Sequence, residues 1–79
     1  MNEVEDTKTT VNGTVEEVLP NSLFRVRIPA STEGEVGELV LAYLAGKMRL
    51  HRIRVLMGDS VEMVLDPYGG RARIVRRLT

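Results

Sequence analysis

The sequence contains no cysteine and no tryptophan, and Phe24, Tyr43 and Tyr68 are its only phenylalanine and tyrosine residues. Without cysteine, the chain has no disulfide, no thiolate metal site and no cysteine nucleophile. With so few aromatic side chains, the core must consist of valine, leucine, isoleucine and methionine. The longest apolar run, residues 39–46, is far shorter than the roughly 18 residues that cross a bilayer. The composition therefore excludes a disulfide scaffold and predicts no membrane span.

Length and composition predict one small globular domain. A chain of 79 residues buries only about 60–65% of its unfolded surface, and 43% apolar with 28% charged residues is ordinary for a globular protein. Residues 1–9 are acidic and lack periodicity, so we expect a flexible tail there and a folded domain over residues 10–79. No basic segment or apolar block follows the amino terminus, which argues against a secretory signal and for a soluble, cytoplasmic protein.

The net charge of zero conceals a division between the two halves of the chain. Residues 1–38 contain eight acidic and three basic residues, a net charge of −5. Residues 39–79 contain eight basic and three acidic residues, a net charge of +5. This asymmetry predicts one face suited to an anion. In the alternative, the two halves interleave in space and their charges cancel.

Hydrophobic periodicity predicts β-strands in the first half of the chain. Residues 10–19 form a strand with Gly13 at a bulge, and residues 20–22 have the composition of a tight turn. Residues 23–28 alternate cleanly between apolar and polar side chains, which is typical of a half-buried strand. Residues 29–38, rich in glycine and glutamate, form a loop.

The second half continues in the same way around one short helix. Each prediction rests on an apolar run, on alternation, or on glycine and proline punctuation. The predicted elements are a strand at 39–44, one or two helical turns at 47–52, strand character at 53–57, a turn at 58–59, an alternating strand at 60–65, a loop at 66–70 and a closing strand at 71–78.

The order of elements predicts an all-β fold. Five strands in so small a chain cannot bury their apolar faces as a flat sheet, and closure into a barrel removes exposed edges. A five-stranded Greek-key barrel with a short helix between strands three and four is the OB-fold. An SH3-like barrel is the main alternative, and the position of the helix favours the OB-fold.

Nothing in the sequence resembles an active site. His51 has no second histidine with which to share a metal, and no serine or carboxylate partner can be placed beside it. We expect His51 to be a surface residue that stacks or hydrogen-bonds. The glycines at 34–37 and 69–70 precede no credible helix, so neither pair forms a phosphate-binding nucleotide loop. The sequence therefore predicts no enzyme, no metal and no cofactor.

The basic residues favour nucleic-acid binding. Side chains two residues apart on a strand share a face, and cations three to five residues apart group along a helix. Phosphates reward such grouping because each neutralised phosphate releases counterions, and Tyr68 and Tyr43 offer stacking surfaces. The grouped cations are Arg25 with Arg27, Arg71 with Arg73, and Lys47 with Arg49 and Arg52.

Several other residues have a structural explanation. Met48 is expected to plug the core beneath the helix, and Phe24 alternates with core positions. Tyr43 continues an apolar strand, so we expect it to be half-buried. Arg76 and Arg77 either contact the nucleic acid or serve only as solubilising charges.

Residues 12–77 resemble bacterial translation initiation factor one, the smallest of three initiation factors. The matching motifs are GTV, LPNSLFRV, GKMR, IRVLMGD, DPY and RARIVRR, in this order. The resemblance implies an OB-fold, in agreement with the strand order. It also implies binding to 16S ribosomal RNA at the decoding site of the small (30S) subunit, where the factor helps the other two initiation factors select the initiator tRNA.

The resemblance further implies a monomer that acts without catalysis, with the other two factors and a small-subunit protein as possible further partners. The turn at 20–22 and Arg25 would approach the RNA, Lys47, Arg49, Arg54 and Arg73 would contact phosphates, and Tyr68 would stack or pack locally. With Arg52 and Arg71 added from the charge pattern, the candidate RNA-binding residues are Asn21, Ser22, Arg25, Lys47, Arg49, Arg52, Arg54, Tyr68, Arg71 and Arg73.

The sequence also departs from the family pattern. The loop at 29–38 is longer and more acidic than expected, so it should point to solvent or to a protein. A general single-stranded RNA-binding or chaperone module of the same fold is the main alternative function, although such domains carry several exposed aromatics. A protein-interaction adaptor that uses the acidic loop is a third hypothesis.

Overall fold

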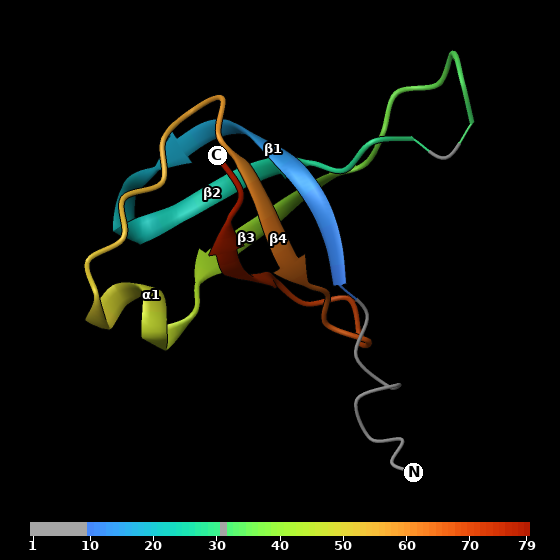
Figure 1. Ribbon diagram of the computed structural model, residues 1–79. Helices are drawn as coiled ribbons and strands as arrows, with labels where there is room; N and C mark the ends of the chain where they lie inside the picture. The colour runs from blue at the N-terminus through green and yellow to red at the C-terminus, as the bar shows by residue number, and fades with distance from the viewer. Residues whose placement is uncertain (1–9, 31) are drawn as a thin grey trace, which may run out of the picture.

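The structure is a computed structural model that describes residues 10–30 and 32–79 (Figure 1). The tail expected at residues 1–9 lies outside the described residues. The elements are β1 (Thr10–Leu19), a 3-10 turn η2 (Pro20–Ser22), β2 (Leu23–Arg27), β3 (Leu39–Leu44), α1 (Gly46–Leu50), β4 (Ser60–Val64) and β5 (Ala72–Arg77).

The five strands close into a barrel in the order β1-β2-β3-β5-β4. All neighbours pair antiparallel except β3 and β5, which run parallel. The short helix α1 lies between β3 and β4 in the chain. The predicted all-β, five-stranded OB-fold barrel is therefore confirmed.

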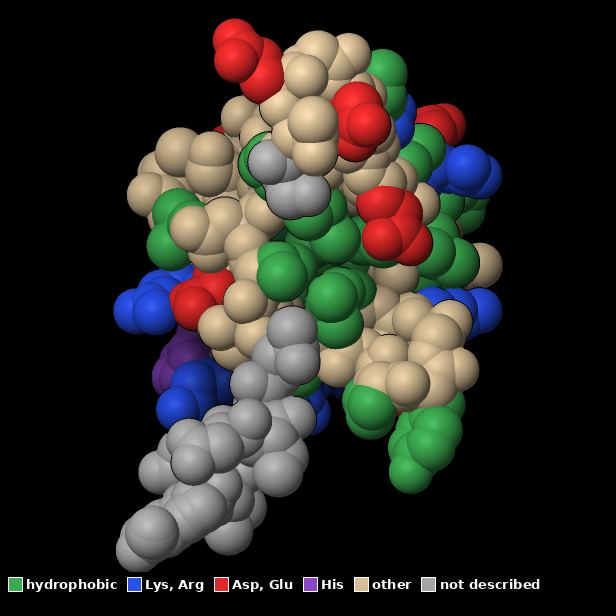
Figure 2. Space-filling view, turned by 90° about the vertical axis from the view of Figure 1, so that its right-hand side faces the viewer, with side chains coloured by type: hydrophobic (Ala, Val, Ile, Leu, Met, Phe, Trp, Pro, Cys, Tyr) green, Lys and Arg blue, Asp and Glu red, His purple; other side chains and the backbone are tan. Residues whose placement is uncertain are grey.

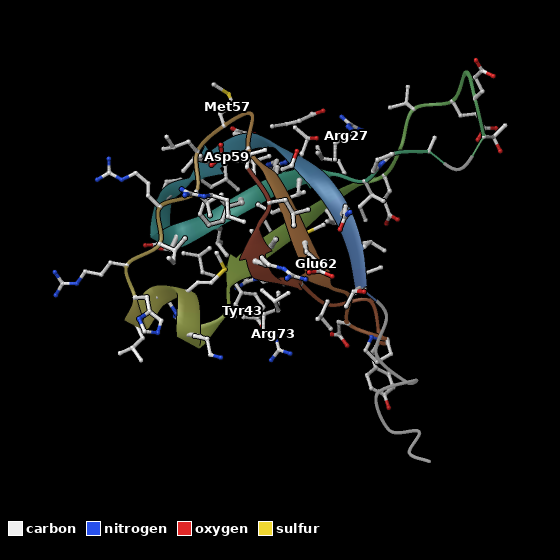
Figure 3. The ribbon with its side chains drawn as sticks, viewed as in Figure 1. Arg27, Tyr43, Met57, Asp59, Glu62 and Arg73 are labelled. Atoms are coloured by element: carbon white, nitrogen blue, oxygen red, sulfur yellow. The ribbon has the colours of Figure 1, made fainter. Side chains whose placement is uncertain are left out.

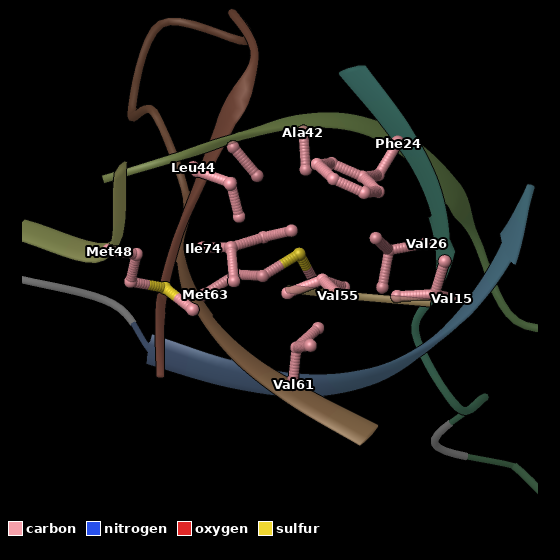
Figure 4. Close-up of a cluster of buried hydrophobic side chains, with 11 residues drawn as sticks. Val15, Phe24, Val26, Ala42, Leu44, Met48, Val55, Val61, Met63 and Ile74 are labelled. Atoms are coloured by element: carbon pink, nitrogen blue, oxygen red, sulfur yellow. The ribbon is translucent and has the colours of Figure 1, made fainter. Parts of the chain in front are cut away.

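Alternation places one set of side chains inside the barrel, as Figure 4 shows. Phe24 and Met48 are both buried, which confirms their predicted core positions. Burial of one such side chain contributes about 1.5–3 kcal/mol, so Met48 alone is a substantial anchor for α1. The full set of buried core residues is Val15, Phe24, Val26, Ala42, Leu44, Met48, Val55, Val61, Met63, Ala72 and Ile74.

Gly13 is not at a bulge, so that prediction was wrong. It pairs with Val61 of β4, and a Cβ atom there would lie 2.6 Å from Val26 Cγ1. The residue is glycine because β1 and β2 approach closely at this point. The register shift of β1 against β2 lies between Val15 and Glu17 instead.

The strand character predicted for residues 53–57 is also wrong, since this segment has no regular structure. Its apolar residues include one buried anchor, Val55. The turn that follows is as predicted: Gly58 has a φ of 94°, and the Asp59 carboxylate accepts the Leu56 N–H at 2.9 Å. Gly58 N–H then donates to the Val15 carbonyl at 2.8 Å, which ties the turn to β1.

The loop between β2 and β3 projects from the end of the barrel opposite α1 (Figure 1). Its base is closed by the Ile28 N–H, which donates to the Glu38 carbonyl at 2.8 Å. Within the described residues, no helix is long and apolar enough to cross a membrane.

Candidate nucleic-acid interface

Helix α1 presents cations to solvent because one residue anchors it. Met48 is its only buried residue, whereas Lys47, Arg49 and Leu50 are exposed. The helix ends at Leu50, and Arg52 then adopts a left-handed φ of 55°. This conformation turns the chain back along the barrel, so the prediction of one or two helical turns is confirmed.

The irregular segment after α1 is held by the end of β5. The Arg77 guanidinium donates from Nη1 to the Arg54 carbonyl at 2.8 Å. Buried Val55 follows Arg54 directly, while the Arg54 side chain remains exposed. Arg77 therefore has a structural contact that neither of the sequence-based alternatives for it included.

Strand β5 points its arginines outward. Ala72 and Ile74 are buried, so Arg73 and the preceding Arg71 face solvent. The parallel register places Arg73 beside Tyr43 of β3, and Figure 3 shows the two side chains together. Tyr43 is half-buried, as expected. These three residues line a hollow of about 230 Å³ together with residues 64–67.

The β4–β5 loop is shaped by Asp66. Its carboxylate accepts the Tyr68 and Gly70 N–H groups, each at 3.0 Å. A Cβ atom at Gly70 would lie 2.1 Å from Asp66 Oδ2, so glycine is required for this close approach. The Tyr68 side chain is 94% exposed. Of its two predicted roles, local packing is therefore excluded and stacking remains.

The η2 turn contributes polar rather than charged groups. Asn21 and Ser22 are exposed, with left-handed φ values of 65° and 61°. The turn lies at the α1 end of the barrel, because Leu23 pairs with Tyr43 near the carboxyl end of β3.

A second hollow, about 300 Å³, lies where α1 meets β5. Met48, Ile53 and Val75 supply its apolar lining. His51 is exposed at this hollow, as predicted for a surface residue. Its charged and titratable lining residues are Lys47, His51, Arg76 and Arg77.

Ion pairing divides the arginines and lysines into two classes. Among the ten described cations, three contact a carboxylate: Arg25 with Glu17 at 3.2 Å, Arg27 with Glu16 at 3.0 Å and Arg76 with Glu62 at 2.6 Å. Both partners of each pair come from the same half of the chain, so the two halves do not cancel through ion pairs. The seven without an ion pair in residues 10–30 and 32–79 are Lys47, Arg49, Arg52, Arg54, Arg71, Arg73 and Arg77, called here the cationic surface.

Figure 2 shows the separation of charge on one face of the molecule. Acidic side chains gather at the end that carries the β2–β3 loop, and basic side chains flank the single histidine near α1. Glu33, Glu35 and Glu38 are all exposed in that loop. The molecule is therefore polar, with the cationic surface away from the acidic loop.

Arg27 belongs to the acidic end, which corrects its predicted grouping with Arg25 as an RNA-facing pair. It donates to both Glu16 carboxylate oxygens, at 3.0 and 3.1 Å, and to the Gly37 carbonyl at 2.8 Å. Hydrogen bonding from Arg27 lowers the pKa of Glu16, and the same bonds raise the pKa of Arg27. Arg27 thus clamps the base of the long loop.

The residues offer little for other chemistry. No group of three or more histidine, aspartate or glutamate side chains lies close enough to hold a metal ion within the described residues. The arrangement instead presents guanidinium and ammonium donors, with two tyrosines beside them, to an anionic partner.

Comparison with known proteins identifies related chains. The family model described as translation initiation factor 1A / IF-1 matches residues 1–79. The translation initiation factor of this type from the Wolbachia endosymbiont strain TRS of Brugia malayi superposes with a TM-score of 0.70 at 30% identity, covering 99% of this chain and 86% of that one. YjeQ from Thermotoga maritima superposes with a TM-score of 0.69 at 28% identity, covering 90% of this chain but only 23% of that protein.

Proposed function

Because this chain belongs to the translation initiation factor 1A / IF-1 family, we propose that it binds the decoding site of the small ribosomal subunit. There it contacts 16S ribosomal RNA and helps the other initiation factors select the initiator tRNA. It acts by binding, without catalysis or a cofactor, as a cytoplasmic monomer.

The cationic surface is the observation that carries this proposal. Its seven side chains have no carboxylate partner among the described residues, so a phosphate competes with no internal ion pair. Each phosphate that they neutralise releases counterions and adds affinity. The guanidinium groups also grip a phosphate through two bonds or stack on a base.

The predicted contact residues differ in how ready they are for RNA. Those of the cationic surface come first, and exposed Tyr68 adds a stacking platform worth about 1–3 kcal/mol if it engages a base. Asn21 and Ser22 offer hydrogen bonds at the α1 end. Arg25 is the weakest member, because Glu17 lies 3.2 Å away and competes with phosphate.

The absence of cysteine allows a direct test of orientation. A single cysteine at Leu50→Cys on α1, or at Val36→Cys in the acidic loop, gives one attachment point for an iron chelate that cleaves nearby RNA. Both positions are highly exposed, at 76% and 82%. On purified small subunits, we expect cleavage of 16S ribosomal RNA around the decoding site from position 50 and much weaker cleavage from position 36. Equal cleavage from both positions, or none from position 50, would contradict the proposal.

A competition experiment separates this function from the RNA-chaperone alternative. Labelled protein is bound to small subunits and challenged with unstructured RNA at equal nucleotide concentration. We expect saturable one-to-one binding that the competitor hardly displaces, because Tyr68 and half-buried Tyr43 are the only tyrosines available for non-specific stacking. Displacement as effective as that by unlabelled subunits would favour the chaperone module.

A further inference from the structure

A third hollow, about 450 Å³, lies away from α1 and is larger than the two beside the cationic surface. The first half of β3 forms one wall, and Gly69–Arg71 of the β4–β5 loop forms the other. Figure 2 shows hydrophobic side chains exposed at the centre of the molecule, below the acidic loop. The apolar residues that line the hollow are Leu39, Val40, Leu41, Leu65 and Ala72.

The β3 wall is a strand edge without a strand beside it. β3 pairs with β2 over Leu39–Tyr43, but with β5 only over Ala42–Leu44. The Ala45 N–H donates to the Ile74 carbonyl of β5 at 2.8 Å. Because backbone groups alternate in direction along a strand, the N–H groups of Leu39 and Leu41 point to the same side. Neither residue pairs with β5 within the described residues.

The lining of the hollow is also incompletely covered. Val40 and Leu65 pack against the core cluster but are only partly buried, and Leu39 is 39% exposed. A strand laid beside Leu39–Leu41 would cover this apolar surface and supply partners for the edge. Backbone hydrogen bonds with side-chain pockets alongside are the means by which a sheet edge recognises an extended peptide.

We propose that the groove between Leu39–Leu41 and Gly69–Arg71 binds an extended segment of a partner protein, which adds to β3 as a short strand. Glu38 and Arg71 both line the groove, so the partner segment complements them with a cation near Glu38 and a carboxylate near Arg71. This inference goes beyond ribosomal RNA binding and does not depend on it.

The same features disfavour other occupants. RNA phosphates would be repelled by Glu38 and by the neighbouring glutamates of the acidic loop, all of them exposed. A second copy of this chain would have to insert a strand that already carries β2 on its other side. The facing wall at Gly69–Arg71 leaves room for a lone strand rather than a barrel.

The test uses the full chain labelled with ¹⁵N and two capped peptides of about six residues, the usual strand length. The peptides alternate valine and threonine, with lysine and glutamate at opposite ends in the two possible orders, to fit either strand direction. We expect one of them to shift the amide signals of Leu39–Leu41 and Gly69–Arg71, and to slow exchange of the Leu39 and Leu41 amides about tenfold. Proline at the centre of that peptide removes a donor and should weaken binding by about tenfold.

Two matched variants check the location. Leu39→Asp places a charge in the groove and should abolish the shifts, whereas Val18→Asp, at a β1 side chain of similar exposure outside the groove, should preserve them. The proposal is overturned if neither peptide shifts these signals at millimolar concentration. It is also overturned if deletion of residues 1–9, dilution of the protein, or an added oligonucleotide changes the same amides in the way expected for a departing or arriving occupant.

Discussion

The β1–β2 ladder and strand β5 both carry arginines at alternate positions, but they place them in opposite surroundings. On β2, Arg25 and Arg27 face carboxylates of β1 at 3.2 and 3.0 Å. On β5, Arg73 pairs in register with Tyr43 on one side and Val64 on the other, neither of which is charged. The cross-strand neighbour, rather than the arginine itself, decides whether a guanidinium remains available to a phosphate.

A β-bulge explains why the acidic side of the barrel neutralises two arginines. The register of β1 shifts between Val15 and Glu17, so Glu16 is the extra residue. Both Glu16 and Glu17 are exposed although they are consecutive in the strand. Each then takes one arginine of β2. Substitutions at the acidic end should therefore affect folding, and substitutions on the cationic surface should affect binding.

The largest effect is expected from Gly37→Ala at the base of the acidic loop. A Cβ atom there would lie 1.6 Å from the Ile28 carbonyl oxygen, so the backbone must move. We expect the free energy of unfolding to fall by about 3 kcal/mol or more, measured by urea denaturation. Gly46→Ala is the control, because nothing lies within 4 Å of a Cβ atom at that position. Equal stability of the two variants would contradict the clamped geometry of the loop.

Two arginines on one strand provide the sharpest test of pairing. Arg73→Ala should weaken small-subunit binding by about 5- to 10-fold, since it removes a phosphate contact worth about 1 kcal/mol. Arg76→Ala removes an arginine whose guanidinium lies 2.6 Å from Glu62, and we expect about a twofold change or less. Equilibrium binding at one fixed salt concentration measures both. A larger loss from Arg76→Ala would mean that ion pairing does not withdraw an arginine from RNA.

The β4–β5 loop should lose both order and stability in Asp66→Ala. Its carboxylate accepts two backbone N–H groups, so their loss should cost about 1–2 kcal/mol of folding free energy, visible as a lower melting temperature. Asp66→Asn retains one acceptor oxygen and should lose less. If both variants melt with the wild type, the two hydrogen bonds do not hold the loop.

The smallest effect concerns the pH dependence of the Glu16–Arg27 contact. Arg27 lowers the pKa of Glu16 in the folded state, so the contact stabilises the protein fully above the ordinary pKa of glutamate. That contribution is lost as pH falls through the lowered value. The stability advantage of wild type over Glu16→Gln should therefore shrink on acidification, in denaturation series at successive pH values. An advantage that is constant with pH would show that the carboxylate charge is not involved.

Much of the fold was predictable because burial leaves a periodic trace in the sequence. The bounds of β3, Leu39–Leu44, match the apolar run that predicted it. Phe24 and Met48 stand at positions where the neighbouring residues are polar or charged, so their inward direction could be inferred. The strand order and the helix position then sufficed for the barrel.

The errors arose where tertiary contacts override local pattern. Residues 53–57 have strand-like composition, but Val55 is the buried anchor of an irregular segment that Arg77 holds at Arg54. Gly13 is required by the close approach of Val26, not by a bulge. Such contacts join residues distant in the chain, and composition carries no signal of them.

The same limit applies to the candidate site. Alternation predicted which arginines point outward, as Arg71 and Arg73 do. It did not distinguish Arg27, which clamps the loop through Glu16 and Gly37. Cross-strand register would have been needed to find that clamp.

The salt dependence of small-subunit binding tests the central claim most directly. Wild type is compared with Lys47→Ala/Arg49→Ala, from the cationic surface, and with Arg25→Ala/Arg76→Ala, which removes two ion-paired arginines and the same charge. Each phosphate contact contributes roughly 0.7–0.9 to the slope of log affinity against log salt. We predict that the first double variant flattens the slope by about 1.5 and that the second leaves it nearly unchanged. Equal slopes for the two double variants would contradict the claim that the cations without an ion pair bind ribosomal RNA.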